Sequence, residues 1–370
     1  MKKINWKNIV GWVVAIAVIF GIIGYNAYQE KQKTMGDKPK VYAILPLSGP
    51  VADMGKKIQS YIQLYMDNTE NVPFEVVYLD DKSKSDQAVS VFQQLTLSAE
   101  KPIVISAVSF ISRVLIPLVQ KEEGFLFGLT TVEANVMKLD SGFQRMAAGV
   151  VEAQWLLDYA NAHYKKMTII NMENDFGIAE RDLFIKDFPK DGREIVQVIG
   201  IPAGEINVRN EVYKAISKPS DAIFISGTVT LAYLNVIKEL KQQGYKGDII
   251  ADLAFSNPYT YESIGEYAEG VITLTTPLDI VGKNVVTNNK MLNVLKQNNI
   301  PPYFLPIQVF DTLDLIKYTM ENNLPFTQET YNKMGKWSGV SGDITLKGGD
   351  SFYPYTVVRV KNGKFVPVEE

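Results

Sequence analysis

From residue 40 onward, short apolar runs alternate with stretches in which apolar residues recur at helical spacing. The run at residues 41–45, for example, precedes a helical pattern from Ile58 to Met66. The pattern predicts strands at residues 41–45, 74–79, 103–107, 125–128, 167–172, 195–199, 222–226, 248–253 and 271–274. It predicts helices between them, for example at residues 231–241 and 307–320. Alternation of this kind is typical of parallel βαβ units.

Near the carboxyl end the pattern changes and predicts an antiparallel hairpin. Residues 352–360 and 364–368 flank Lys361-Asn362-Gly363, and Asn-Gly is the preferred two-residue turn. The chain has 370 residues, whereas one domain usually takes about 100–200. We therefore expect an α/β protein of two domains, with enough strands for two doubly wound sheets.

A charge-free apolar run occupies residues 9–25 and follows a basic stub, residues 1–8, that contains Lys2, Lys3 and Lys7. Positive charge before such a run favours the cytoplasmic side, so we expect the chain after Tyr25 to be extracytoplasmic. The run is at the short end for a spanning helix. A cleaved signal peptide, which would release the protein, is the alternative, but it needs a small residue where Tyr25 stands. We therefore favour one N-terminal transmembrane helix, followed by a polar linker at residues 26–39.

Composition and charge exclude several classes of function. The chain carries 38 Lys and Arg against 41 Asp and Glu, a net charge of −3, which offers nucleic acid no basic surface. It contains no cysteine, so disulfides and thiolate metal sites are excluded. It also has no Walker phosphate loop, no G-x-S-x-G elbow and no zinc-binding histidine pattern. We therefore expect no cofactor, no metal, no catalytic residues and no nucleic acid partner.

Five segments of the chain resemble one family in their order and spacing. They are residues 41–55 (VYAILPLSGPVADMG), 77–88 (VYLDDKSKSDQA), 103–124, 174–177 (NDFG) and 339–366. The resemblance is to the branched-chain amino-acid-binding proteins of the class I periplasmic-binding-protein superfamily, which are the extracytoplasmic receptors of ABC importers. It covers the chain beyond the amino-terminal segment. Many relatives are tethered through a lipidated cysteine, which this chain lacks.

This resemblance implies two doubly wound parallel-sheet lobes joined by a three-stranded hinge. The chain would cross between the lobes near residues 145–149, 275–278 and 339–344. Lobe 1 would comprise residues 40–147 and 278–340, and lobe 2 residues 148–275 and 341–370.

In the first lobe the resemblance implies that hydroxyls and backbone amides hold a ligand carboxylate. Ser109, Phe110 and Ser112 stand in the matching loop before a helix, whose amino terminus is a natural anion site. Thr130 and Thr131 follow the next strand, and the resemblance implies that they contact the same carboxylate. The alternative for the serines is an ordinary helix N-cap.

In the second lobe, Phe176 stands where relatives place an aromatic side chain over the ligand, and Thr228 offers another hydroxyl. Leu253 falls where amino-acid-binding relatives place a glutamate that pairs with the ligand's ammonium group. An unpaired buried cation is costly, so we predict that free leucine binds weakly or not at all, unless Asp252 substitutes through a one-residue slip. Met54, in lobe 1, replaces an aromatic pocket residue and indicates an altered ligand shape. Core packing is the alternative for Met54 and Phe176, and loop capping for Thr228.

The other polar features do not favour catalysis. The single histidine, His163, lies in a helical pattern far from these loops, which is typical of a helix-surface residue. Asp80 and Asp81 are neighbours on a strand and point to opposite faces, so we do not expect an acid–base pair.

These features predict a membrane-anchored, non-catalytic receptor whose two lobes close over a small organic solute, such as an amino acid, an amide or a carboxylate. The resemblance implies that it is the substrate-binding component of an ABC importer, with permease and ATPase subunits as partners. The alternative is a ligand-sensing ectodomain that signals to a separate membrane protein without transport. An enzyme on this fold is a third class, but no nucleophile–base or metal constellation supports it.

Overall fold

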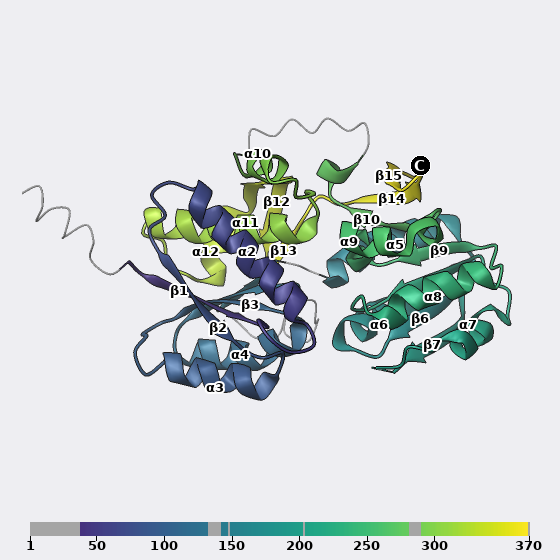
Figure 1. Cartoon of the computed structure of the whole chain (residues 1–370), viewed down its shortest axis with the longest axis horizontal. Helices are drawn as coiled ribbons and strands as arrows, with labels where there is room; N and C mark the ends of the chain where they lie inside the picture. Colours follow the sequence, from purple (N-terminus) through teal and green to yellow (C-terminus); the bar gives the residue numbers. More distant parts are fainter. Residues whose placement is uncertain (1–37, 132–141, 147–148, 203, 281–289, 369–370) are drawn as a thin grey trace, which may run out of the picture.

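The computed structural model describes residues 38–131, 142–146, 149–202, 204–280 and 290–368. The predicted basic stub, the apolar run and all but the end of the linker lie outside these residues. Within the described residues, no helix is both long and apolar enough to span a bilayer. The described chain forms two α/β lobes that lie side by side (Figure 1).

Lobe 1 is built on an eight-stranded sheet with the order β11-β12-β13-β5-β4-β3-β1-β2. Its strands are β1 Lys40–Leu45, β2 Glu75–Asp80, β3 Ile103–Ala107, β4 Phe125–Leu129, β5 Phe143–Arg145, β11 Lys336–Gly339, β12 Gly342–Lys347 and β13 Asp350–Phe352. Its helices are α2 Ala52–Asn68, α3 Ser85–Leu95, α4 Ser109–Lys121, α10 Lys290–Gln297, α11 Phe304–Glu321 and α12 Gln328–Met334.

Lobe 2 is built on a seven-stranded sheet with the order β15-β14-β10-β9-β8-β6-β7. Its strands are β6 Lys166–Met172, β7 Glu194–Ile201, β8 Ala222–Ser226, β9 Asp248–Ala251, β10 Ile272–Thr275, β14 Thr356–Lys361 and β15 Lys364–Pro367. Its helices are α5 Gly149–His163, α6 Asp175–Asp187, α7 Arg209–Ile216, α8 Leu231–Gln242 and α9 Pro258–Tyr261. Short 3₁₀ turns follow β9, α9 and β10, at η2 Leu253–Ser256, η3 Glu262–Ala268 and η4 Pro277–Asp279.

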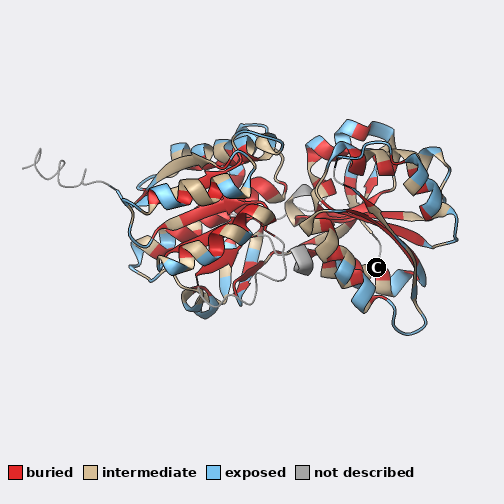
Figure 2. Cartoon of the chain, turned by 90° about the horizontal axis from the view of Figure 1, so that it is seen from below, coloured by how far each residue is buried: buried red, intermediate tan, exposed pale blue. Residues whose placement is uncertain are grey.

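The burial of each strand follows from its position in the sheet. Every residue of β4 and β8 is buried, as expected for apolar parallel strands with helices on both faces, whereas the edge strands β2 and β7 are mostly half-buried. Figure 2 shows the buried residues concentrated in the two sheets and on the helix faces against them. The nine predicted strands are confirmed, with ends that differ by a few residues. The hairpin is confirmed with shorter strands, and Asn362 and Gly363 at its turn both have positive φ.

Two predictions of topology are wrong. The sheets are mixed, because β11, β12 and β13 pair antiparallel to one another in lobe 1, and β14 pairs antiparallel to β10 and β15 in lobe 2. The third crossing lies after β13, at residues 353–355, and not near residues 339–344, so residues 341–352 belong to lobe 1. The physical reason is that β13 pairs with β5, where the Arg145 guanidinium forms a buried ion pair with Asp350.

Candidate ligand-binding site

A cavity of about 620 Å³ lies between the lobes and takes side chains from both. That volume is ample for a small organic ligand, because typical small-molecule sites hold about 300–1,000 Å³. The lobe 1 wall consists of Pro50, Val51, Asp53, Met54, Lys57, Val108, Ser109, Phe110, Thr130, Phe304, Leu305 and Gln308. The lobe 2 wall consists of Glu152, Asn174, Asp175, Phe176, Thr228, Val229, Leu253, Ala254, Asn257, Tyr259 and Thr260.

The loop between β1 and α2 positions the first wall. The carboxylate of Asp80, at the end of β2, accepts hydrogen bonds from the backbone N–H groups of Leu47 and Ser48 at 3.0 and 3.1 Å. It also accepts one from the Ser48 hydroxyl at 2.7 Å. The loop is thereby tied to the neighbouring strand, and the first turns of α2 present Met54 and Lys57 to the cavity.

The α4 amino terminus forms a second part of this wall. Its N-cap residue, Val108, has φ of 62°, and Thr130, in the loop after β4, has φ of 50°. Positive φ is rare for non-glycine residues, above all β-branched ones, and such strain clusters at functional sites. No side chain caps this helix, and Ser109 and Phe110 of its first turn both line the cavity.

Two predicted ligand residues of lobe 1 do not line the cavity. The hydroxyl of Ser112 hydrogen-bonds the hydroxyls of Ser106 and Thr131, each at 2.7 Å, and all three side chains are buried. This chain of hydroxyls joins β3, α4 and the loop after β4. Ser112 and Thr131 therefore position the two strained loops from behind instead of facing the ligand.

In lobe 2, Phe176 lies in the first turn of α6 and lines the cavity. Thr228, in the loop after β8, also lines the cavity. The helix is capped by Asn174, whose side-chain oxygen accepts the N–H of Gly177 at 3.0 Å. Next to Phe176, Asp175 forms an ion pair across the lobes with Arg113 of α4, at 3.3 Å.

The structure separates the roles of Asp252 and Leu253. Leu253 lines the cavity, whereas Asp252 is fully buried and absent from the cavity wall. The Asp252 carboxylate accepts hydrogen bonds from Gly227 N–H at 2.6 Å, Ala254 N–H at 3.1 Å and the Tyr233 hydroxyl at 3.2 Å. The predicted strand at 248–253 is therefore too long: β9 ends at Ala251, and Asp252 caps η2 instead of replacing the missing glutamate.

Sequence reasoning missed the cation of the cavity. Lys57 lies on α2 of lobe 1, and its ammonium group is 3.9 Å from the ring centroid of Tyr259 in lobe 2. Burial lowers the pKa of Lys57, and the nearby carboxylate of Asp53 opposes that shift. In sequence, Lys57 looks like any solvated position of an amphipathic helix.

Sequence reasoning also missed two buried polar side chains, Glu152 of α5 and Gln308 of α11. One carboxyl oxygen of Glu152 accepts the Tyr355 hydroxyl at 2.9 Å. Burial raises the pKa of Glu152 to about 7, and the neighbouring carboxyl of Asp252 adds to the shift. The sequence does contain a signal for such a residue, which is a polar side chain inside an apolar run. Gln308 in residues 304–310, FLPIQVF, is an example.

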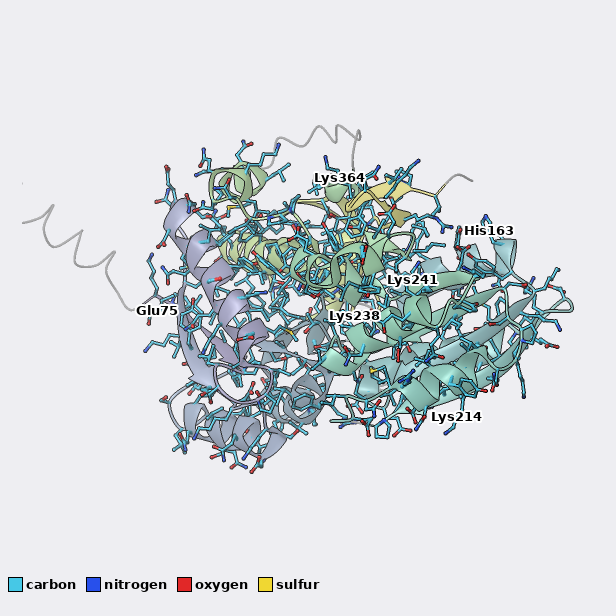
Figure 3. The ribbon with its side chains drawn as sticks, turned by 45° about the vertical axis from the view of Figure 1, so that its right-hand side comes forward. Glu75, His163, Lys214, Lys238, Lys241 and Lys364 are labelled. Carbon is cyan, nitrogen blue, oxygen red and sulfur yellow. The ribbon has the colours of Figure 1, made fainter. Side chains whose placement is uncertain are left out.

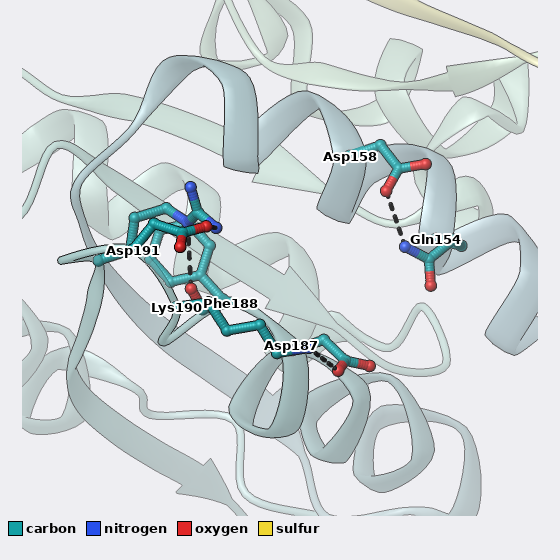
Figure 4. A network of polar contacts seen from close by, with 7 residues as sticks. Gln154, Asp158, Asp187, Phe188, Lys190 and Asp191 are labelled. Atoms are coloured by element: carbon teal, nitrogen blue, oxygen red, sulfur yellow. Dashed lines mark hydrogen bonds and ion pairs between the residues drawn. The ribbon is translucent and has the colours of Figure 1, made fainter.

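The polar contacts of lobe 2 around His163, Gln154 and Asp187 lie outside the cavity wall. His163 is exposed at the end of α5 (Figure 3). Its ring nitrogen lies 2.8 Å from the Tyr159 carbonyl oxygen. On the outer face of α5, Gln154 donates to Asp158 at 2.8 Å, near the Asp187–Lys190 contact (Figure 4). Among the described residues, no group of three His, Cys, Asp or Glu side chains is arranged to hold a metal ion.

Two mixed-sheet α/β lobes with a ligand-sized cavity between them define the class of two-lobed solute-binding proteins. The family model for periplasmic binding proteins matches residues 39–345, and the chain belongs to this family. The resemblance seen in the sequence is thereby confirmed. Comparison with curated protein sequences gave no match.

Solved structures share the fold at low sequence identity. A leucine binding protein from Thermotoga maritima is 22% identical with a TM-score of 0.76, over 90% of this chain and 98% of that one. A solute binding protein of an ABC transporter from Rhodopseudomonas palustris, in complex with 4-hydroxybenzoate, is 17% identical with a TM-score of 0.76. The match covers 90% of this chain and 96% of that one. An extracellular ligand binding receptor from Desulfohalobium retbaense is 20% identical with a TM-score of 0.74, and this chain covers 60% of its length.

Proposed function

We propose that this protein is an extracytoplasmic receptor that binds a small organic carboxylate between its lobes and delivers it to an ABC importer, without chemistry on the ligand. The observation that carries the proposal is a single cavity with walls from both lobes. A ligand there contacts both walls only when the lobes are together. It would therefore shift the population toward the closed form, which membrane subunits can distinguish.

The lobe 1 wall suits a carboxylate. The uncapped amino terminus of α4 directs N–H groups and the positive end of the helix dipole toward the cavity beside Ser109 and Phe110. Lys57 supplies a cation to the same cavity. The ring of Phe176 and the side chains of Met54 and Leu253 offer apolar contact for the body of the ligand.

The lobe 2 wall lacks the glutamate that the resemblance implies for an α-amino acid, and its two carboxyl groups have other partners: Asp175 pairs with Arg113, and Glu152 accepts the Tyr355 hydroxyl. Leu253 offers no charge to an ammonium group, and the carboxylate of Asp252 is committed to lobe 2 backbone and Tyr233. The structural relatives accommodate leucine in one case and 4-hydroxybenzoate in another. The fold therefore does not require an ammonium group, and we place this chain with the receptors for simple carboxylates.

Transport also needs partners and a location. We propose that residues 9–25 anchor the receptor beside permease and ATPase subunits, with the three crossing segments acting as the hinge. The same closure could instead signal to a separate membrane protein, which is the second role that the sequence predicts.

Leucine and 4-methylpentanoate, which is leucine without its amino group, test the proposal as a matched pair. We expect 4-methylpentanoate to raise the melting temperature of the purified full-length chain, because a ligand that binds only the folded state stabilises it. Leucine should give no shift at the same concentration. Lys57→Gln should reduce the shift with 4-methylpentanoate. A larger shift with leucine would contradict the assignment, and no shift with any small carboxylate would contradict the receptor function.

A further inference from the structure

The part of the cavity wall next to Tyr355 carries two buried polar side chains that the carboxylate contact does not use. Gln308 has no exposed surface and Glu152 is 4% exposed, yet both line the cavity. Their neighbours Phe304 and Leu305 in α11 make this part of the wall otherwise apolar. Tyr355, in the third crossing, lies behind both side chains.

The amide of Gln308 is the more informative of the two. It lies beside the Tyr355 phenol, but among the described residues neither its oxygen nor its nitrogen makes a hydrogen bond of good geometry. A buried amide without partners is costly, and native proteins keep very few of them. A polar side chain that is fully buried, lies in a cavity wall and has only the Tyr355 phenol beside it keeps hydrogen-bonding capacity for a group that arrives with the ligand.

Glu152 decides which charge that group carries. The groups that face it are the Tyr355 hydroxyl, the carboxyls of Asp252 and Glu180, and the guanidinium of Arg145. Arg145 is already paired with Asp350. Burial raises the pKa of Asp252 to about 7, although its carboxylate accepts three hydrogen bonds that favour the ionised form. An ionised Asp252 repels a second negative charge on Glu152, so the two buried carboxyls do not both ionise readily. A neutral Glu152 carboxyl, able to donate and to accept, is the form that fits these surroundings.

We infer that Glu152 and Gln308 form a subsite for a neutral hydrogen-bonding group, a hydroxyl or a carboxamide, at the end of the ligand remote from its carboxylate. This inference rests on the proposed carboxylate receptor and narrows its substrate class to carboxylic acids with a second, uncharged polar end. Glu152 and Gln308 are then the specificity-determining residues of that end. A terminal ammonium group would meet a neutral Glu152 carboxyl instead of a carboxylate. A terminal carboxylate group would find no positive charge on Glu152 or Gln308.

Four probes that differ only at the para position test the inference: benzoate, 4-hydroxybenzoate, 4-carbamoylbenzoate and 4-(aminomethyl)benzoate. Calorimetric titration of the full-length chain in lipid nanodiscs should show the hydroxyl and carboxamide probes binding roughly tenfold tighter than benzoate. The ammonium probe should bind no tighter than benzoate. If benzoate and its derivatives bind equally, the subsite is overturned while the receptor function stands. If none binds, both proposals fail.

Two variants separate the subsite from a purely structural role. Gln308→Leu should bind all four probes alike, and should melt at a higher temperature than the wild type without ligand, because it removes an unpartnered buried amide. Glu152→Gln should keep the affinity for 4-hydroxybenzoate within about threefold at pH 6. It should also abolish the loss of affinity that we expect of the wild type above pH 7, where Glu152 ionises. A Glu152→Gln variant that loses all binding at pH 6 would assign the subsite to a cation and overturn the inference.

Discussion

Several carboxyl groups are buried in this protein without a cation beside them, and Asp311 of α11 is the clearest case. Its Oδ1 accepts the Val340 N–H at 2.7 Å, while its side chain has no exposed surface. Burial raises the pKa of Asp311 to about 8, and the charge of Asp314 adds to the shift. Asp311 therefore makes the stability of lobe 1 depend on pH.

We predict that the free energy of unfolding falls as pH rises from 5.5 to 7.5, and that Asp311→Asn flattens this slope. In the folded chain Asp311 keeps its proton up to pH values of about 8, whereas in the unfolded chain it ionises near about 4. The folded state thus binds more protons in this window, and one such group lowers stability by up to about 1.4 kcal/mol per pH unit. Urea denaturation at several pH values measures the slope.

Asp187→Asn is the matched control for that experiment. It makes the same carboxyl-to-amide change at a partly exposed carboxyl whose pKa is lowered by its hydrogen bond from Lys190, so the group titrates below this window. The control should keep the wild-type slope. An unchanged slope in Asp311→Asn would mean that Asp311 is ionised in the folded protein.

Positions in the cavity wall were predictable where the family resemblance indicated them, and their contacts with a ligand stay predictions. Met54, Ser109, Phe110, Thr130, Phe176, Thr228 and Leu253 all line the cavity. Lys57, Glu152 and Gln308 were missed, because a polar residue on a helix gives the same sequence pattern toward a cavity as toward solvent. Ser112, Thr131 and Asp252 were misassigned, since only coordinates show that their partners are other protein groups.

At the scale of elements, strands were predicted from local pattern and sheet membership was not. An apolar run identifies a strand wherever it lies in the fold. The pairing of β13 with β5 depends on Arg145 and Asp350, which lie 205 positions apart in the chain. No local pattern contains that information, and so the predicted third crossing was wrong.

The start of α2 packs so closely that only glycine fits. A Cβ on Gly55 would lie 2.1 Å from the carbonyl oxygen of Pro46, in the loop after β1. We predict that Gly55→Ala lowers the free energy of unfolding by about 1–3 kcal/mol, as other overpacked sites do. Because Met54 and Lys57 belong to the same turns, the displaced helix should also weaken 4-methylpentanoate binding.

Lys56→Ala provides the control for this substitution. Lys56 is exposed on the same helix, and surface changes of this kind stay within about 0.5 kcal/mol. Urea denaturation and calorimetric titration of both variants test the prediction. Equal stability of Gly55→Ala and wild type would show that the loop after β1 yields to the new methyl group.

For the molecule as a whole, three contacts that join the lobes at the cavity are an ion pair, a cation–π contact and an aromatic edge contact. Arg113 of α4 pairs with Asp175 of α6, and the Lys57 ammonium lies over the Tyr259 ring. The Tyr259 ring also meets Tyr303 of lobe 1 edge-on, with centroids 6.4 Å apart. The ion pair and the cation–π contact can form and break as the lobes close and open, because both lie at partly exposed side chains.

We predict that the Arg113–Asp175 pair stabilises the closed form and so strengthens ligand binding. Arg113→Gln should weaken the affinity for 4-methylpentanoate by up to about fivefold, since half-exposed ion pairs contribute about 0–1 kcal/mol. Neither residue needs to contact the ligand for this effect, because the pair acts on the equilibrium between open and closed forms. Small-angle scattering without ligand should show a larger mean radius of gyration for the variant.

The reversed pair distinguishes this role from a local effect on either helix. Arg113→Asp alone should weaken binding more than Arg113→Gln, because two carboxylates then face each other across the rim. Adding Asp175→Arg should restore affinity to within about twofold, since the attraction returns with opposite polarity. Raising the salt concentration should reduce the difference in affinity between the single and double variants. Salt screens both the repulsion in the single variant and the attraction in the double variant. If the double variant binds no better than Arg113→Asp alone, the pair does not control closure.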